Sequence, residues 1–147
     1  MDLTFALAEV SGWVIAALTG FTVCLPYLLR RRLRPAGARV ERLRPHYWIG
    51  FTLAGLSLLH AGLAMSSGPT PGDARWTAGI WLAAGAMLLV FGQVSLGVGL
   101  RRLRGAERRR RRRLHFMTMT LLVAAGLAHV VLNGPLARGL LAYAHVG

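Results

Sequence analysis

The chain is poor in cysteine, in acidic residues and in the motifs of the common enzyme classes. Its 147 residues include one cysteine, Cys24, which excludes an internal disulfide and a C-x-x-C-H attachment motif. Lysine is absent, and five acidic residues stand against 18 arginines, which gives a formal net charge of +13. Neither a G-x-S-x-G nucleophile motif nor a glycine-rich phosphate loop occurs, so the sequence offers no hydrolase or nucleotide site of these kinds.

Hydrophobic residues, in contrast, are abundant and continuous. They make up 54% of the chain, and the mean hydropathy is +0.48. Four apolar runs each reach the roughly 20 residues that cross a hydrocarbon core, namely Leu3 to Leu29, Tyr47 to Met65, Trp76 to Leu100 and Leu114 to Leu132. The short connections leave no room for a separate soluble domain. We therefore expect an all-α membrane protein, a four-helix up-down-up-down bundle formed by one domain over residues 1–147.

The helix limits follow from the turn and charge signals at the ends of the runs. Asn133, Gly134 and Pro135 break the last helix. A short tail at 136–146 remains, either a helix lying on the outer surface or a frayed end. The first run is expected to be a retained helix, because Asp2 and Glu9 replace the basic start of a signal peptide. The expected helices are at about residues 3–29, 46–66, 76–100 and 114–133.

The arginines predict the orientation in the membrane. Seven lie between Arg30 and Arg44 and nine between Arg101 and Arg113, whereas the connection from Ser66 to Arg75 carries one acid and one base. By the positive-inside rule both arginine-rich loops are cytoplasmic, which places both termini outside. We expect a multi-pass protein of a bacterial-type plasma membrane. Nucleic acid is not an expected partner, since the arginine run has little aromatic interleaving.

Four of the five histidines form two pairs with the same spacing. His46 and His60 lie in the second apolar run, and His115 and His129 in the fourth, each pair separated by 14 residues. Fourteen residues make nearly four helical turns, so both members of a pair lie on one helix face, about 21 Å apart along the axis. His145, in the tail, is expected at the surface.

In an up-down bundle the second and fourth helices run in the same direction, so their histidines meet at two levels. His46 and His115 form an inner pair at the cytoplasmic boundary, and His60 and His129 form an outer pair. Two facing imidazoles are the axial ligands that a six-coordinate haem iron requires. Structural zinc fits poorly, because no thiol or carboxylate converges on these histidines.

Small and basic residues nearby are candidates for contacts with the cofactor. Glycines on the histidine faces and in the third run leave room for a flat macrocycle, although packing between helices explains such glycines equally well. Arginines close to the histidines or at the outer side are candidate partners of the haem propionates. The candidates are Gly50, Gly126, Gly85, Gly92, Arg44, Arg113 and Arg75.

The doubled H-x13-H spacing over Pro45 to Asn133 resembles the haem-binding half of cytochrome b from respiratory bc complexes. It is similar in principle to ferric-reductase-like and other small dihaem b-type cytochromes. The resemblance implies that the four paired histidines are axial ligands of two b haems. The chain lacks the Pro-Glu-Trp-Tyr motif of the bc-type protein and a flavin or nicotinamide domain. It is therefore expected to be an electron carrier and not a complete enzyme.

The expected function is transmembrane electron transfer, as a subunit or partner of a quinone-linked or dehydrogenase-linked redox system. Expected partners are membrane lipid, haem and a redox protein at the inner or outer face; a quinone, and homo- or hetero-oligomerisation, stay open. The alternative is a membrane protein without haem, either a proton or ion conduit with a histidine relay or a structural anchor.

Overall fold

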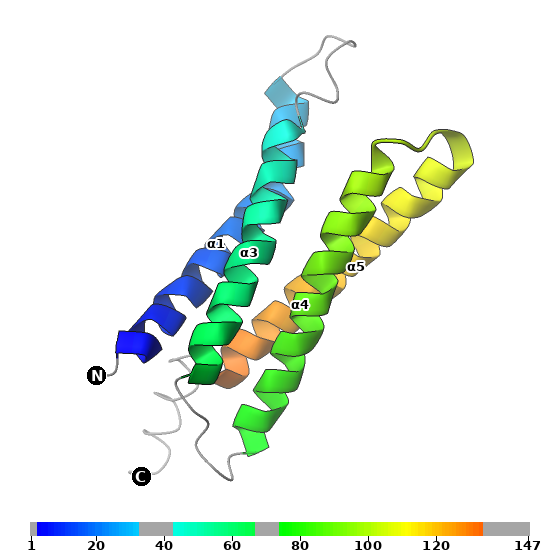
Figure 1. Ribbon diagram of the computed structural model, residues 1–147. Coiled ribbons are helices and arrows are strands. Elements are labelled where there is room, and N and C mark those ends of the chain that lie inside the picture. The colour runs from blue at the N-terminus through cyan, green and yellow to red at the C-terminus, as the bar shows by residue number, and fades with distance from the viewer. Residues whose placement is uncertain (1–2, 33–42, 67–73, 134–147) are drawn as a thin grey trace, which may run out of the picture.

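The computed structural model describes residues 3–32, 43–66 and 74–133, and these form helices joined by one short connection (Figure 1). The expected tail at 136–146, most of the first arginine-rich loop and the connection at 67–73 lie outside the described residues. The helices are α1 (Leu3–Arg32), α3 (Arg44–Ser66), α4 (Ala74–Leu100) and α5 (Gly105–Asn133).

Each of these helices is long and apolar enough to cross a membrane. Large apolar side chains point outward, among them Met65 and Trp81, both 73% exposed. Only Ala8, Leu25, Leu53 and Ala54 are buried apolar residues among those described. A water-soluble domain could not leave apolar surface of this extent uncovered, whereas lipid covers it without cost. The prediction of an all-helical membrane protein with four candidate spans is confirmed.

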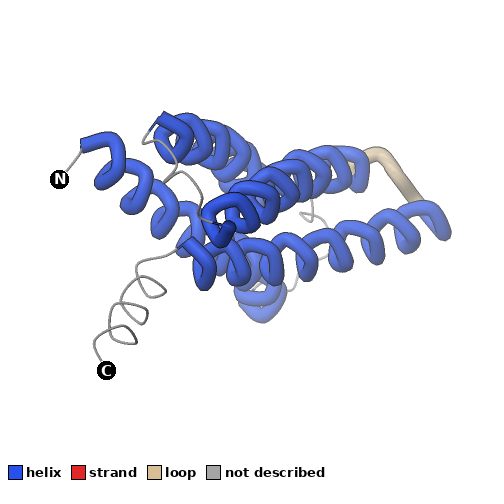
Figure 2. The backbone as a smooth tube through the Cα atoms, turned by 90° about the horizontal axis from the view of Figure 1, so that it is seen from below, coloured by secondary structure: helices blue, strands red, loops and turns tan. Residues whose placement is uncertain are grey.

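The helices form two hairpins that lie against each other. α1 packs on α3, α4 packs on α5, and α3 packs on α4 to join the hairpins. Figures 1 and 2 show the pairs side by side, with a spread between them toward one end. α3 and α5 do not belong to the closely packed pairs, so contact between them depends on side chains that reach across.

The start of α5 differs from the prediction. The apolar run begins at Leu114, but the helix begins at Gly105 and includes the whole run Arg108–Arg113. Arginine is a good helix former, and Glu107 in the first turn interacts favourably with the helix dipole. Gly105 has a φ of +60°, a conformation that glycine adopts readily. The extension adds about 13 Å of cationic helix before the apolar part begins.

The other helix limits agree with the prediction to within three residues. α1 continues three residues beyond Leu29, and α3 and α4 each begin two residues early. Hydropathy marks only the apolar part of a helix, and its polar end turns lie beyond that part.

Candidate functional site

The structure brings the four histidines together in two facing pairs. The ring centroids of His46 and His115 are 6.4 Å apart with the ring planes at 80°, and those of His60 and His129 are 6.3 Å apart at 86°. The first histidine of α3 faces the first of α5, and the second faces the second. The two helices therefore run in the same direction, and the pairs lie at two levels.

The spacing within each pair suits a shared metal ion. Two imidazoles that each bind one metal through a nitrogen, at about 2 Å, place their ring centroids about 6 Å apart. Both pairs have this separation, although the α3 and α5 backbones are not closely packed. The rings of each pair meet edge to face, at a separation that two ligands of one metal ion would also have.

Backbone carbonyls on the flanking helices hold the outer pair. Nδ1 of His60 lies 3.0 Å from the Ala8 carbonyl oxygen on α1, and Nδ1 of His129 lies 3.1 Å from the Gly79 carbonyl oxygen on α4. A carbonyl only accepts hydrogen bonds, so Nδ1 must carry the proton in both rings. Nε2 then keeps its lone pair, which is the arrangement of a histidine that binds a metal through Nε2.

The inner pair is held less firmly. Nδ1 of His46 and Nδ1 of His115 are buried, and neither has a hydrogen-bond partner in the described part of the chain. Thr22 on α1 lies near the His46 ring, and Gln93 on α4 lies near the His115 ring. The Gln93 side-chain amide donates to the His115 carbonyl at 2.7 Å and so ties α4 to α5 at this level.

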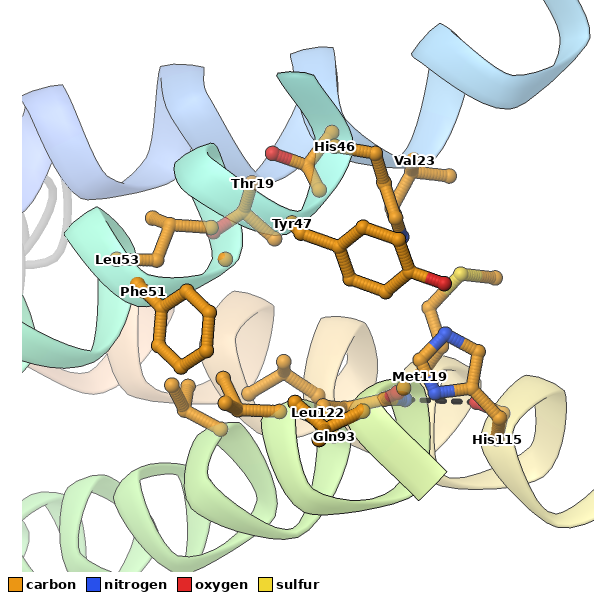
Figure 3. Close-up of a pocket in the computed structure, with 16 residues that line it drawn as sticks. Thr19, Val23, His46, Tyr47, Phe51, Leu53, Gln93, His115, Met119 and Leu122 are labelled. Carbon is orange, nitrogen blue, oxygen red and sulfur yellow. Dashed lines mark hydrogen bonds between the residues drawn. The ribbon is translucent and has the colours of Figure 1, made fainter. Parts of the chain in front are cut away.

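A cavity lies beside the inner pair (Figure 3). His46 and Tyr47 reach into it from α3, and His115 and Met119 from α5. Its empty volume is about 670 Å³, open space at its mouth included. Cofactor sites in proteins have mostly apolar walls. The remaining lining is largely apolar, with Gln93 on α4 and Thr19 and Thr22 on α1 as its polar exceptions.

The candidate glycines lie in two kinds of surroundings. Gly50 lines the cavity, and a methyl group there would meet Val94 at 3.9 Å. A methyl group at Gly85, Gly92 or Gly126 would meet nothing within 4 Å. Space is therefore present beside these three glycines, but no described atom lies close enough to require glycine there. Their role as cofactor contacts stays a prediction.

Two glycines that were not among the candidates for cofactor binding lie directly against the histidines. A methyl group at Gly12 would lie 3.0 Å from Cε1 of His60, and one at Gly97 would lie 3.7 Å from Cε1 of His115. Gly12 allows the His60 ring to lie on α1. The sequence predicts that a porphyrin edge or a neighbouring backbone approaches Gly12 closely, whereas the structure places the His60 ring there.

The basic candidates are less closely placed. Arg44 and Arg113 are exposed, each two residues before an inner histidine, and the side chain of Arg75 lies outside the description. Arg101, which sequence reasoning missed, stacks over the ring of Tyr47 with Cζ 5.5 Å from its centroid. Since Tyr47 lines the cavity, Arg101 is the arginine with a described contact to a residue of the inner site.

Each level offers two histidines as candidate ligands. No cluster of three or more His, Cys, Asp or Glu side chains able to hold a metal ion occurs in residues 3–32, 43–66 and 74–133. A closed zinc site takes four protein ligands, whereas a porphyrin supplies four of the six positions around iron and leaves two. The histidine pairs fit the second arrangement. Comparison with protein-family models, characterised proteins and solved structures finds no match to this chain.

Proposed function

We propose that this protein carries electrons across a membrane through two b-type haems, each held between one histidine of α3 and one of α5. The observation that carries the proposal is the pair of facing imidazole couples at matched levels, with centroids 6.4 and 6.3 Å apart. The equal 14-residue spacing on two helices that run in the same direction brings the histidines together at both levels.

Each part of the chain has a role in this proposal. His46 and His115 would hold the inner haem, and His60 and His129 the outer one. The Ala8 and Gly79 carbonyls orient the outer ligands through Nδ1. The apolar helices exclude water, and bound haem supplies a reversible one-electron iron couple. The sequence holds neither a G-x-S-x-G nucleophile motif nor a glycine-rich phosphate loop, which favours an electron carrier over a complete enzyme.

The proposal includes an orientation. The helices cross a bacterial-type plasma membrane up, down, up and down, with both termini outside and the arginines of both connections in the cytoplasm. The exposed α5 extension lies outside the hydrocarbon, because a cationic helix of this length is unfavourable there. Haem, lipid and a redox protein at either face are the proposed partners, and a quinone at a haem edge is a further candidate.

A reduced-minus-oxidised visible spectrum of the detergent-solubilised chain, with haem quantified per polypeptide, tests the proposal. The wild type is expected to show a low-spin b-type spectrum and two haems. His60→Ala and His129→Ala each remove one axial ligand at the outer level, so each is expected to fall toward one haem. His46→Ala and His115→Ala each remove one axial ligand at the inner level. Each is therefore expected to lose the inner haem and keep the outer one.

The chain contains its own control for these variants. His145→Ala removes the fifth histidine, which has no expected ligand role, and is expected to keep both haems. A colourless wild-type protein, expressed with haem in excess, would reject the proposal. The paired histidines would then be candidates for a proton relay or for packing.

A further inference from the structure

The two members of the outer pair are held by different means. His129 contacts α4 through the Gly79 carbonyl alone among the hydrogen bonds described for its ring. His60 contacts α1 through the Ala8 carbonyl and, in addition, through the Ser11 hydroxyl, whose Oγ lies 3.1 Å from Nδ1. Ser11 is the one described side chain that hydrogen-bonds to any of the four paired histidine rings.

The Ser11 hydroxyl makes a second hydrogen bond. It donates to the Ala8 carbonyl oxygen at 2.9 Å, so its hydrogen points away from His60. Its lone pairs remain to accept from Nδ1. Were Nδ1 without a proton, its lone pair would face the Ala8 oxygen at 3.0 Å, and two acceptors would repel each other. The contacts among Nδ1 of His60, Oγ of Ser11 and the Ala8 carbonyl oxygen therefore favour the tautomer of His60 with its proton on Nδ1.

We infer that Ser11, acting with the Ala8 carbonyl, fixes His60 as its Nδ1–H tautomer and so aims the Nε2 lone pair at His129. Ser11 is a positioning residue for the outer site. The inference rests on the proposed function only for the identity of the group that Nε2 binds. The tautomer itself is a property of the chain without any cofactor.

Gly12 completes the positioning. Its missing side chain leaves the His60 ring room on the surface of α1, where a methyl group would come within 3.0 Å of Cε1. That distance is shorter than carbon atoms normally approach, so the ring would have to move. The segment from Ala8 to Gly12 thus sets both the protonated nitrogen of His60 and the place of its ring.

The tautomer is measured by nitrogen-15 NMR of the histidine side chains in the full chain, purified in detergent after growth without haem supply. We expect His60 and His129 to carry their proton on Nδ1. Ser11→Ala removes one of the two acceptors of the His60 Nδ1–H and keeps the Ala8 carbonyl, so it should move the His60 Nδ1 signal without changing the tautomer and leave His129 unchanged. Ser11→Thr keeps the hydroxyl and should restore the wild-type signal. A His60 protonated on Nε2, or a signal that Ser11→Ala leaves unmoved, would overturn the inference.

Ser66→Ala is the matched control for the hydroxyl. Ser66 makes the same bond as Ser11, to a carbonyl three residues earlier at 2.9 Å, but the hydrogen bonds described for it include no histidine. It is therefore expected to leave all histidine signals in place. If Ser66→Ala moved His60 as much as Ser11→Ala does, the effect would be general and the assignment to Ser11 wrong.

The second measurement is haem titration of the same variants. Residues that hydrogen-bond to metal-binding histidines change the metal affinity by about 10–100-fold. Ser11→Ala should therefore weaken haem binding at the outer pair about tenfold. Gly12→Ala should weaken it further, whereas Gly20→Ala, on the same helix with nothing within 4 Å, should not. If neither haem binds while the tautomer result holds, the proposed function fails and the role of Ser11 stands. If both haems bind and Ser11→Ala leaves the His60 Nδ1 signal unmoved, the role of Ser11 fails alone.

Discussion

At the scale of single residues, Gly79 makes two separate contacts with α5. Its carbonyl accepts from His129, and its Cα lies so close to Asn133 that any side chain at position 79 would collide with the Asn133 amide. Gly79 is buried, and a Cβ there would displace the terminal atoms of the Asn133 side chain. Glycine at this position is therefore explained by contact with a neighbouring helix, and not by its backbone angles.

Gly79→Ala is expected to destabilise the fold by about 1–3 kcal/mol, the usual cost of overpacking, and to weaken the outer site. Denaturant unfolding in detergent and haem stoichiometry measure the two effects. The double variant with Asn133→Ala should recover most of the stability, because it removes the colliding amide, whose Oδ1 has no described partner. Gly62→Ala, with open space around it, is the control. Equal losses in Gly79→Ala and Gly62→Ala would contradict this explanation.

The residue scale also shows what sequence could and could not predict. The two histidine pairs were predictable, because 14 residues return a helix to nearly the same face and side chains are identifiable in sequence. The carbonyls of Ala8 and Gly79 were not, since every residue carries one and only the packed helices select which is used. Ser11 was not predicted for the same reason: its partner, His60, lies on another helix, 49 positions along the chain.

At the scale of helices, hydropathy located all four elements but placed the start of α5 late. Hydropathy reports where lipid can surround a helix, whereas the helix itself continues as long as its backbone bonds and propensities allow. Exposed Arg108, Arg109 and Arg110 therefore lie on a helix that continues into α5. The arginine run is a rigid extension of the last span and not a loose loop.

Orientation is the property that this element is expected to control. A reporter active only outside the cytoplasm should be active at the C-terminus and inactive when inserted at residues 103–104. Replacing the arginines between 30 and 44 and between 101 and 113 with glutamine removes the charge difference, so this variant should lose its fixed orientation and show mixed activity at both positions. Reporter assays of both fusions provide the measurement. An unchanged orientation in the neutral variant would contradict control by arginine.

At the scale of the whole molecule, the two hairpins have equivalent parts. In each, a backbone carbonyl of the first helix accepts from the outer histidine of the second. In the first hairpin this is the Ala8 carbonyl, which accepts from His60. In the second it is the Gly79 carbonyl, which accepts from His129. Each hairpin thus provides one histidine of both pairs, and neither pair forms without both hairpins.

This division predicts how stability responds to ligand. The hairpins join through α3 and α4, and the described residues include no side chain that is fully buried, so direct packing between them is limited. A ligand held between α3 and α5 would join the hairpins a second time. Haem at about 1,000 times its dissociation constant should stabilise the chain by about 4 kcal/mol per site. Thermal unfolding in detergent should therefore rise with haem concentration in the wild type.

The variant with alanine at all four paired histidines should lose this dependence, because it keeps the helices and removes every proposed ligand. His145→Ala, in contrast, should respond as the wild type does. Haem also partitions into detergent and onto apolar helix surfaces, and such binding would raise the unfolding temperature of all three proteins alike. Equal responses would therefore show that haem does not join the hairpins through these histidines. A response confined to the proteins that keep the two pairs would show that it does.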